Sequence, residues 1–311
     1  MTVSDLKPIL GKIKGEILWS EPLSRHTTFR VGGPADVLFY PKNVSELATV
    51  FSRVVQYQIP YFILGQGSNL LFPDEGFQGV IFNLSHFDGI EILERDSKAV
   101  RIKVQAGIDK KRLLNWTIER GFSGLEFLSG VPGQIGGGLF MNAGCFGDFS
   151  KIAEKICLMN EAAKIEELPI RSCDFSYRSQ SFCKNKIIIA SVFRLNYEKK
   201  EILKARVQKL LDDRKEKQPF GYPSCGSTFK NPPDTLAGRL IETAGCKGYR
   251  VGDAEVSKKH ANFIINHGHA TSRDILAIID YVKKRVKETH SVELEEEVIV
   301  VQSRRTKAET V

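Results

Sequence analysis

The chain has 311 residues and a mass of 34.9 kDa, which suits two or three compact units better than a single core. Hydrophobic residues make up 42% and charged residues 26%, an ordinary globular composition that excludes a disordered or fibrous protein. The net charge of +8 suits an enzyme that gathers phosphate-bearing ligands as well as a nucleic-acid binder. Because the basic residues are scattered rather than gathered with aromatics, we expect no nucleic-acid partner.

Residues 1–20 alternate charged and apolar side chains and lack the apolar core of a signal peptide. No later run reaches the length of a membrane span. We therefore expect a cytoplasmic protein without a membrane partner, whose six cysteines are reduced thiols and form no zinc site. These cysteines, which include no CxxC pair, are Cys145, Cys157, Cys173, Cys183, Cys225 and Cys246.

The first predicted elements are a strand at Thr28–Val31 and, after a Gly-Gly-Pro turn, a helix that begins at Asn43. Asn43 is the expected N-cap, because Glu46 follows three residues later and an apolar face comes next. A short buried strand, Tyr61–Leu64, runs directly into the sequence Gly-Gln-Gly-Ser-Asn.

The segment Gly65–Asn69 offers backbone N–H groups and short polar side chains, which can hold a phosphate without a dedicated cation. It is no Rossmann fingerprint, because Leu70 stands where a third glycine is expected. The sequence GxxxxGK[ST] is also absent, which excludes a P-loop.

A hairpin, Gly89–Arg95 with Ala99–Ala106, and a helix from Asp109 to Arg120 precede the glycine-rich stretch Gly130–Gly147. Seven glycines in this stretch describe a backbone shaped for close contact. Two interpretations stay open from its residues alone, a packed crossover between strands and a ligand-binding surface.

Three further strands and a charged helix complete the first part of the chain. They are expected at Lys155–Asn160, Lys164–Pro169, Ile187–Tyr197 and Glu198–Lys217. The second unit opens with the turn-rich segment Pro219–Pro232, followed by a helix at Asp234–Ala244 and a long helix that starts at Thr271 with a capping box. Strands around these helices and at the end indicate an α+β unit.

Arg178, Ser227 and Glu297 are the candidate chemical groups, since each lies in a polar or glycine-rich context beside apolar residues. Alternation along the expected last strand places Glu295 and Glu297 on one face and Glu296 on the other. Taken singly, each candidate is more commonly a surface or structural residue. Ser227 lacks the G-x-S-x-G frame of a serine hydrolase, and no cluster with metal-ligand spacing is present.

Four segments carry a resemblance to a known family: HTTFRVGGPAD, LGQGSNLLFPDEGFQGVIF, GVPGQIGGGLFMNAGCFG and PSCGSTFKNP. Together with YRS and LEEEV, in unbroken order from about His26 to Val300, they resemble the UDP-N-acetylenolpyruvoylglucosamine reductases. The resemblance implies an α+β chain with a two-subdomain FAD-binding fold of the PCMH or vanillyl-alcohol-oxidase type, followed by an α+β substrate-binding domain. The implied limits are an N-terminal segment at 1–23, the FAD-binding domain at 24–197 and the substrate domain at 198–311.

The resemblance also implies non-covalent FAD, because the first loop has no histidine or cysteine and Cys145 stands at the far edge of the second. The implied cofactor-binding residues are Gly65, Gly67, Ser68, Asn69, Leu70, Gly130, Pro132, Gly133, Gly136, Gly137, Asn142, Ala143 and Gly144.

By the same resemblance, NADPH reduces FAD, which then passes hydride to UDP-N-acetylglucosamine enolpyruvate. Ser227 is implied as the proton donor, and Arg178 and Glu297 as the groups that stabilise the enolate. Tyr177, Lys230 and Asn231 are implied substrate-binding residues. We see no inserted segment between Ile187 and Pro219, which indicates the shorter, type II form. We also expect a monomer.

Two alternatives remain. Another flavin oxidase of the same fold would use oxygen in place of NADPH, but it would have no reason to carry Arg178, Ser227 and Glu297 together. A nucleotide-binding or nucleic-acid-binding protein without chemistry would also suit the basic charge.

Overall fold

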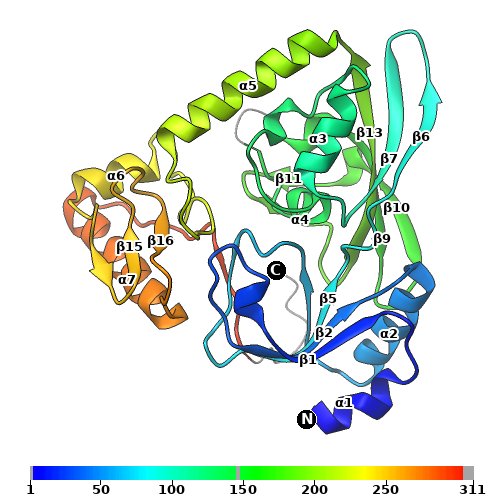
Figure 1. Cartoon of the computed structure of the whole chain (residues 1–311), viewed down its shortest axis with the longest axis horizontal. Coiled ribbons are helices and arrows are strands. Elements are labelled where there is room, and N and C mark those ends of the chain that lie inside the picture. Colours follow the sequence, from blue (N-terminus) through cyan, green and yellow to red (C-terminus); the bar gives the residue numbers. More distant parts are fainter. Residues whose placement is uncertain (1–2, 145–147, 304–311) are drawn as a thin grey trace.

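A computed structural model describes residues 3–144 and 148–303 of the chain. Its first layer is a four-stranded sheet in the order β1-β2-β5-β3, in which β1 and β2 are antiparallel and the other neighbours are parallel. Helices α1 and α2 flank this sheet (Figure 1). The bounds are α1 Val3–Leu10, β1 Glu16–Pro22, β2 Pro34–Tyr40, α2 Val44–Gln56, β3 Tyr61–Leu64 and β5 Phe77–Asn83.

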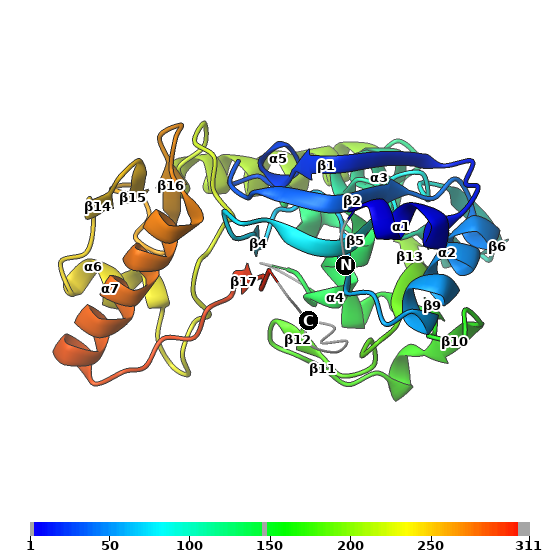
Figure 2. The same ribbon diagram turned by 90° about the horizontal axis from the view of Figure 1, so that it is seen from below.

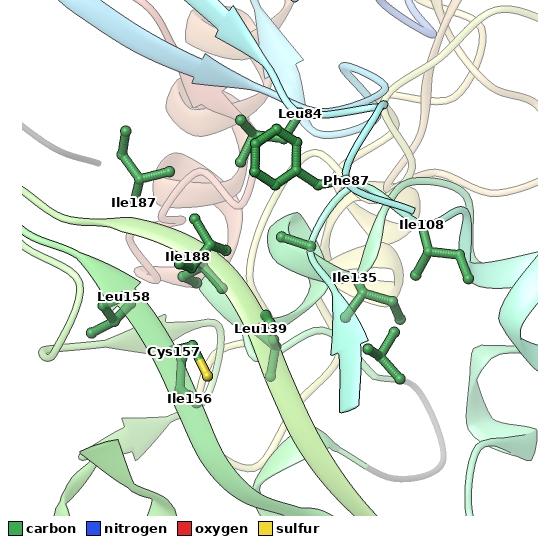
Figure 3. Packing of buried hydrophobic residues seen from close by; sticks show 14 of the residues in the cluster. Leu84, Phe87, Ile108, Ile135, Leu139, Ile156, Cys157, Leu158, Ile187 and Ile188 are labelled. Carbon is green, nitrogen blue, oxygen red and sulfur yellow. The ribbon is translucent and has the colours of Figure 1, made fainter. Parts of the chain in front are cut away.

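The second layer is an antiparallel sheet in the order β10-β9-β13-β7-β6, with β8 added to one end of β13. Ile135 and Leu139 of α4 belong to the same buried cluster as Ile156 and Ile188 of its central strands (Figure 3). The bounds are β6 Ile90–Arg95, β7 Ala99–Gln105, α3 Lys110–Ile118, β8 Phe122–Ser123, α4 Ile135–Phe140, β9 Ala153–Met159, β10 Ile165–Pro169 and β13 Ile187–Tyr197.

A third unit follows the long helix α5, Lys200–Lys217, which extends from the second sheet toward it (Figure 1). This unit has a three-stranded antiparallel sheet and two helices over a buried cluster that also includes Phe29, Val31 and Leu71 of the first unit. Its bounds are α6 Ala237–Thr243, β14 Arg250–Val251, β15 Ala254–Val256, β16 Ile264–Asn266 and α7 Ser272–His290. Within the described ranges, no helix combines the length and the apolar character needed to cross a bilayer.

After α7 the chain returns to the first unit (Figure 2). Strand β17, Ile299–Val300, pairs in parallel with β4, Leu70–Leu71. Val301 then enters a buried cluster of the first sheet that is separate from the cluster under α1 and α2. The last described segment therefore ties the third unit to the loop that follows β3.

Local sequence signals account for most of these elements. Asn43 caps α2 by accepting a hydrogen bond from the backbone N–H of Glu46, as predicted. The capping box of α7 is also confirmed, with Thr271 and Asp274 each bonding to the other's backbone N–H. The predicted hairpin and the three strands that end at Tyr197 are present within one or two residues.

The expected strand at Thr28–Val31 is wrong. The Thr27 hydroxyl donates to the Val31 carbonyl, and Arg30 has a left-handed φ of 58°, so the segment forms a turn. The helix expected from Asp234 begins only at Ala237, because Asp234 has a φ of 61° and cannot continue a helix.

The expected last strand through Glu297 is also wrong, because the strand covers only Ile299–Val300. Glu295 and Glu297 do not share a face: Glu295 is exposed and paired with Lys230 at 3.2 Å, whereas Glu297 points inward. Alternation fails here because the backbone bends before the strand begins.

Candidate active site

One cavity of about 460 Å³ lies where the three units meet. Its walls come from the end of β3, both glycine-rich loops, α4, and the segments around Arg178, Ser227 and Glu297. The three candidate catalytic residues therefore line a common space. So do twelve of the predicted cofactor-binding residues: Gly65, Gly67, Ser68, Asn69, Leu70, Gly130, Pro132, Gly133, Gly136, Gly137, Ala143 and Gly144.

The loop after β3 is held against the turn that replaces the expected first strand. Gly67 has a φ of +61°, and a Cβ there would lie 2.3 Å from the His26 carbonyl oxygen. The Thr28 N–H donates to the Gly67 carbonyl at 3.1 Å. A glycine is thus required at this position by packing, which leaves the backbone of the loop exposed to the cavity.

The side chain of Gln66 joins the two glycine-rich loops. Its Nε2 donates to the Asp109 carboxylate at 2.8 Å, and its Oε1 accepts from the Gly133 N–H at 3.0 Å. A backbone bridge between Asp109 and Gln134 adds to this connection. The loops consequently form one continuous wall.

The second glycine-rich stretch contains a short helix, α4, and its glycines serve different purposes. A Cβ on Gly138 would lie 2.6 Å from the Phe149 ring, and one on Gly136 would lie 3.0 Å from the Ala106 Cβ. A Cβ on Gly137 would meet nothing within 4 Å, because this position opens on the cavity. Packing therefore accounts for the glycines at 136 and 138, whereas Gly137 leaves the cavity wall open. Its residues 145–147, with Cys145, lie outside the described ranges.

Arg178 and Glu297 form an ion pair at the cavity wall. The Arg178 Nε donates to the Glu297 Oε1 at 2.6 Å, and the two side chains are only 17% and 14% exposed. Arg178 has a φ of 56° in the turn between β11, Phe175–Ser176, and β12, Ser179–Gln180. Burial raises the pKa of Glu297, while the charge of Arg178 and its hydrogen bond oppose this rise.

Backbone hydrogen bonds hold the segment that contains Ser227 and Thr228 next to Glu297. The Glu297 N–H donates to the Thr228 carbonyl at 2.8 Å, and the Asn69 side chain donates to the Glu297 carbonyl at 2.9 Å. Glu297 is thereby fixed between the residue after Ser227 and the loop after β3. The site combines a cation, a buried carboxyl group and a hydroxyl group, which together can stabilise a negative charge and supply a proton.

Both parts of the chain are similar to known proteins. Residues 218–301 match the UDP-N-acetylenolpyruvoylglucosamine reductase C-terminal domain, and residues 35–162 match the FAD binding domain. The reductase of Caldanaerobacter subterraneus subsp. tengcongensis is 41% identical over 96% of this chain and 97% of its own. The Bacillus subtilis reductase is 39% identical over 92% of this chain and 94% of its own.

The chain belongs to the UDP-N-acetylenolpyruvoylglucosamine reductase family. The crystal structure of UDP-N-acetylenolpyruvylglucosamine reductase from Thermus caldophilus superimposes with a TM-score of 0.79 at 33% identity. The superposition covers 93% of this chain and 99% of that one. The chain is therefore an enzyme of an FAD-binding oxidoreductase family, and its predicted α+β fold of a two-part FAD-binding region followed by a C-terminal domain is confirmed.

Four predicted residues of this reductase do not line the cavity as the described residues define it. Asn142 is buried and donates to the Ser176 carbonyl at 3.1 Å. The Tyr177 ring lies against the Arg178 guanidinium, with 5.0 Å between the ring centroid and Cζ. Lys230 pairs with Glu295, and the Asn231 Oδ1 accepts from the backbone N–H of Ala237 at the start of α6.

Several cavity residues were missed by the sequence reasoning, and three of them are cations: Lys110, Lys186 and Arg214. Lys110 carries the clearest perturbation, because burial lowers its pKa to about 8. No feature of the sequence singles out Lys110, which directly follows the N-cap Asp109. A signal for its burial was present only in the three-dimensional packing of α3 against the second glycine-rich loop.

The residues present fit FAD. With Arg178, four cations line the cavity against one carboxylate, Glu297, among the described lining residues, which favours an anionic ligand. The open space at Gly137 and the N–H groups of both loops leave room and donors for a diphosphate and a flat ring. Phe140 and Ile188 supply apolar wall for such a ring.

Proposed function

We propose that the chain catalyses the NADPH-dependent reduction of UDP-N-acetylglucosamine enolpyruvate to UDP-N-acetylmuramate in peptidoglycan precursor biosynthesis, with non-covalent FAD. The observation that carries this proposal is the buried Arg178–Glu297 pair in a glycine-lined cavity that also contains Ser227. The names of the reductases that resemble the chain support the substrate. In this proposal residues 24–197 bind FAD, residues 198–311 complete the substrate site, and residues 1–23 form an N-terminal segment.

When bound between the two glycine-rich loops, FAD would supply the hydride chemistry, with NADPH as the source of the hydride and the vinyl terminus of the enolpyruvyl group as its acceptor. The residues of the chain then stabilise the negative charge on the substrate and supply a proton to it. Electron density collects as an enolate beside the substrate carboxylate, where the Arg178 guanidinium stabilises it. Burial raises the pKa of Glu297. In its protonated form Glu297 donates a hydrogen bond to the oxygens of the enolate and the substrate carboxylate.

Ser227 gives its hydroxyl proton to the α carbon, which completes the addition of one hydride and one proton. A serine is a weak acid, so the basicity of the enolate supplies the driving force. Tyr177, Lys230 and Asn231 bind substrate in this proposal. Tyr177 has the most direct structural support, since its ring orients the Arg178 guanidinium.

The two half-reactions provide the test. The purified protein should be yellow, should bleach with NADPH, and should be reoxidised by UDP-N-acetylglucosamine enolpyruvate much faster than by oxygen. Ser227→Ala should leave bleaching by NADPH unchanged and slow reoxidation by the enolpyruvate by about 10²- to 10⁴-fold, the range of general acid catalysis. The matched control is Ser52→Ala, because the Ser52 hydroxyl bonds to the Ala48 carbonyl within α2.

Three results would contradict the proposal. A colourless protein that takes up no FAD would exclude flavin chemistry altogether. A flavin reoxidised faster by oxygen than by the enolpyruvate would indicate an oxidase instead. Equal loss of both half-reactions in Ser227→Ala would remove Ser227 from its assigned role.

We further propose that the enzyme is a cytoplasmic monomer of the shorter, type II form, with small molecules as its partners and neither nucleic acid nor membrane. The direct passage from β13 to α5, with only residues 198–199 between them, supports the short form. Light scattering after size exclusion should give a mass near 34.9 kDa.

A further inference from the structure

Lys110 is an unusual lysine because its whole side chain is inside the protein. The residue is 4% exposed, and its Nζ donates to the Pro132 carbonyl at 3.0 Å. Neighbouring Lys111, on the outer side of α3, is exposed. Lys110 also lines the cavity, so its ammonium group lies between the core and the ligand space.

The ammonium group of Lys110 forms no ion pair with a carboxylate among the described residues, although the charge of Asp109 is near enough to oppose the lowering of its pKa. No carboxylate in these ranges lies within 4.0 Å of its Nζ. Both oxygens of Asp109, the nearest acid in sequence, are engaged by the Arg112 N–H and the Gln66 side chain at 2.8 Å each. A buried charge without a partner is costly, and proteins rarely keep one without a compensating group.

The position of the ammonium group shows where that compensating group would sit. A Cβ built on Gly133 would lie 3.3 Å from the Lys110 Nζ and 2.9 Å from the Ser68 hydroxyl oxygen. The lysine, the serine and the Gly133 backbone therefore converge where the two glycine-rich loops meet. The Gln66 side chain and the bond from the Lys110 N–H to the Gly133 carbonyl, at 3.0 Å, fix this junction.

We propose that Lys110 supplies the counter-charge for the diphosphate of bound FAD at the junction of the two loops. The proposal rests on FAD being the cofactor. The sequence predicted that Gly65–Asn69 holds a phosphate without a dedicated cation, whereas this proposal assigns Lys110 as that cation. The diphosphate is the matching anion because the adjacent hydroxyl and backbone N–H groups are the donors that phosphate oxygens accept.

Binding should consequently be coupled to proton uptake. Burial lowers the pKa of Lys110 to about 8, with a smaller opposing effect from Asp109 and further lowering by Arg214 of α5 and by Arg178. A diphosphate beside the ammonium group would raise this pKa again. At about pH 8.5, roughly three-quarters of the FAD-free protein would carry neutral Lys110, so FAD would bring a similar fraction of a proton with it.

The experiment is calorimetric titration of the FAD-free protein with FAD at about pH 8.5 in two buffers of different ionisation enthalpy. The variants are Lys110→Met and Lys110→Gln, with Lys111→Met as the matched control. Wild type and control should take up well over half a proton, and both Lys110 variants close to none. The variants should bind FAD about 10- to 100-fold more weakly, the effect of losing a charge-assisted hydrogen bond.

Riboflavin, which lacks the diphosphate, separates this role from a merely structural one. Its affinity, measured by fluorescence quenching, should be equal in wild type and all variants, and equal affinity also shows that the variants are folded. Unchanged FAD affinity or unchanged proton uptake in the Lys110 variants would overturn the proposal. Equal weakening for FAD and riboflavin would also overturn it, whereas a wild-type protein that binds no FAD would refute the proposed function itself.

Discussion

Lys110→Met should make the FAD-free protein more stable at neutral pH. In the folded state the pKa of Lys110 falls from 10.5 to about 8, because burial disfavours the charged form. This difference of about 2.5 pKa units corresponds to about 3 kcal/mol, since one unit is about 1.4 kcal/mol. Loss of the hydrogen bond to the Pro132 carbonyl offsets about 1 kcal/mol. A net gain of about 2 kcal/mol in the free energy of unfolding remains.

The pH dependence has a definite sign. Below about pH 8 the lysine is protonated in both states, and the full cost of the buried charge is present. As the pH rises from about 8 toward 10.5, the folded state releases the proton while the unfolded state keeps it. Wild-type stability therefore rises across this window relative to Lys110→Met, and the advantage of the variant disappears.

Urea unfolding followed by tryptophan fluorescence measures this difference. Trp19 in β1 and Trp116 in α3 are the two tryptophans of the chain, and both lie in the region that contains Lys110. Lys111→Met should change stability by less than about 0.5 kcal/mol, as expected for an exposed position. A Lys110→Met protein that is less stable at pH 7, or whose advantage is independent of pH, would refute the reasoning.

Three further outcomes are expected. Gly137→Val should weaken FAD binding with little change in melting temperature, whereas Gly136→Val should lower the free energy of unfolding by about 1–3 kcal/mol, because its Cβ would crowd Ala106. A Gly137→Val protein that is less stable than Gly136→Val would contradict this geometry. Reoxidation of the flavin by the enolpyruvate, in stopped flow from about pH 5 to about pH 9, should slow as the pH rises through the raised pKa of Glu297, and Glu297→Gln should abolish this dependence. Asn266→Leu should lower the free energy of unfolding, measured in urea, by about 3 kcal/mol, because the buried amide donates to the Phe29 carbonyl and accepts hydrogen bonds from two backbone N–H groups. A loss of less than about 1 kcal/mol would show that these hydrogen bonds are dispensable.

Local chemistry decided which features the sequence could predict. The caps at Asn43 and Thr271 depend on residues three positions away, and both are confirmed. The glycine-rich loops and Arg178, Ser227 and Glu297 could be proposed together because their order along the chain matches a family. The structure brings them to one cavity.

Long-range contacts decided the rest. The bend at Glu297 depends on pairing of β17 with β4, more than two hundred residues earlier, so alternation along the chain could not find it. The turn at Thr28–Val31 forms because Gly67 packs against it. No local signal in the sequence marks Lys110 as buried, and only the packing of α3 under the second loop reveals its burial.

The late pairing of β17 with β4 also has a consequence for synthesis of the protein. Both glycine-rich loops leave the ribosome well before residues 297–301, yet Asn69 obtains its hydrogen bond to Glu297, and β4 its parallel partner, only from those residues. A nascent chain stopped after α7 would therefore carry a cofactor site without the carboxyl group that pairs with Arg178. The site around Arg178 therefore becomes complete only when residues 297–301 have been synthesised and have folded back onto the first unit.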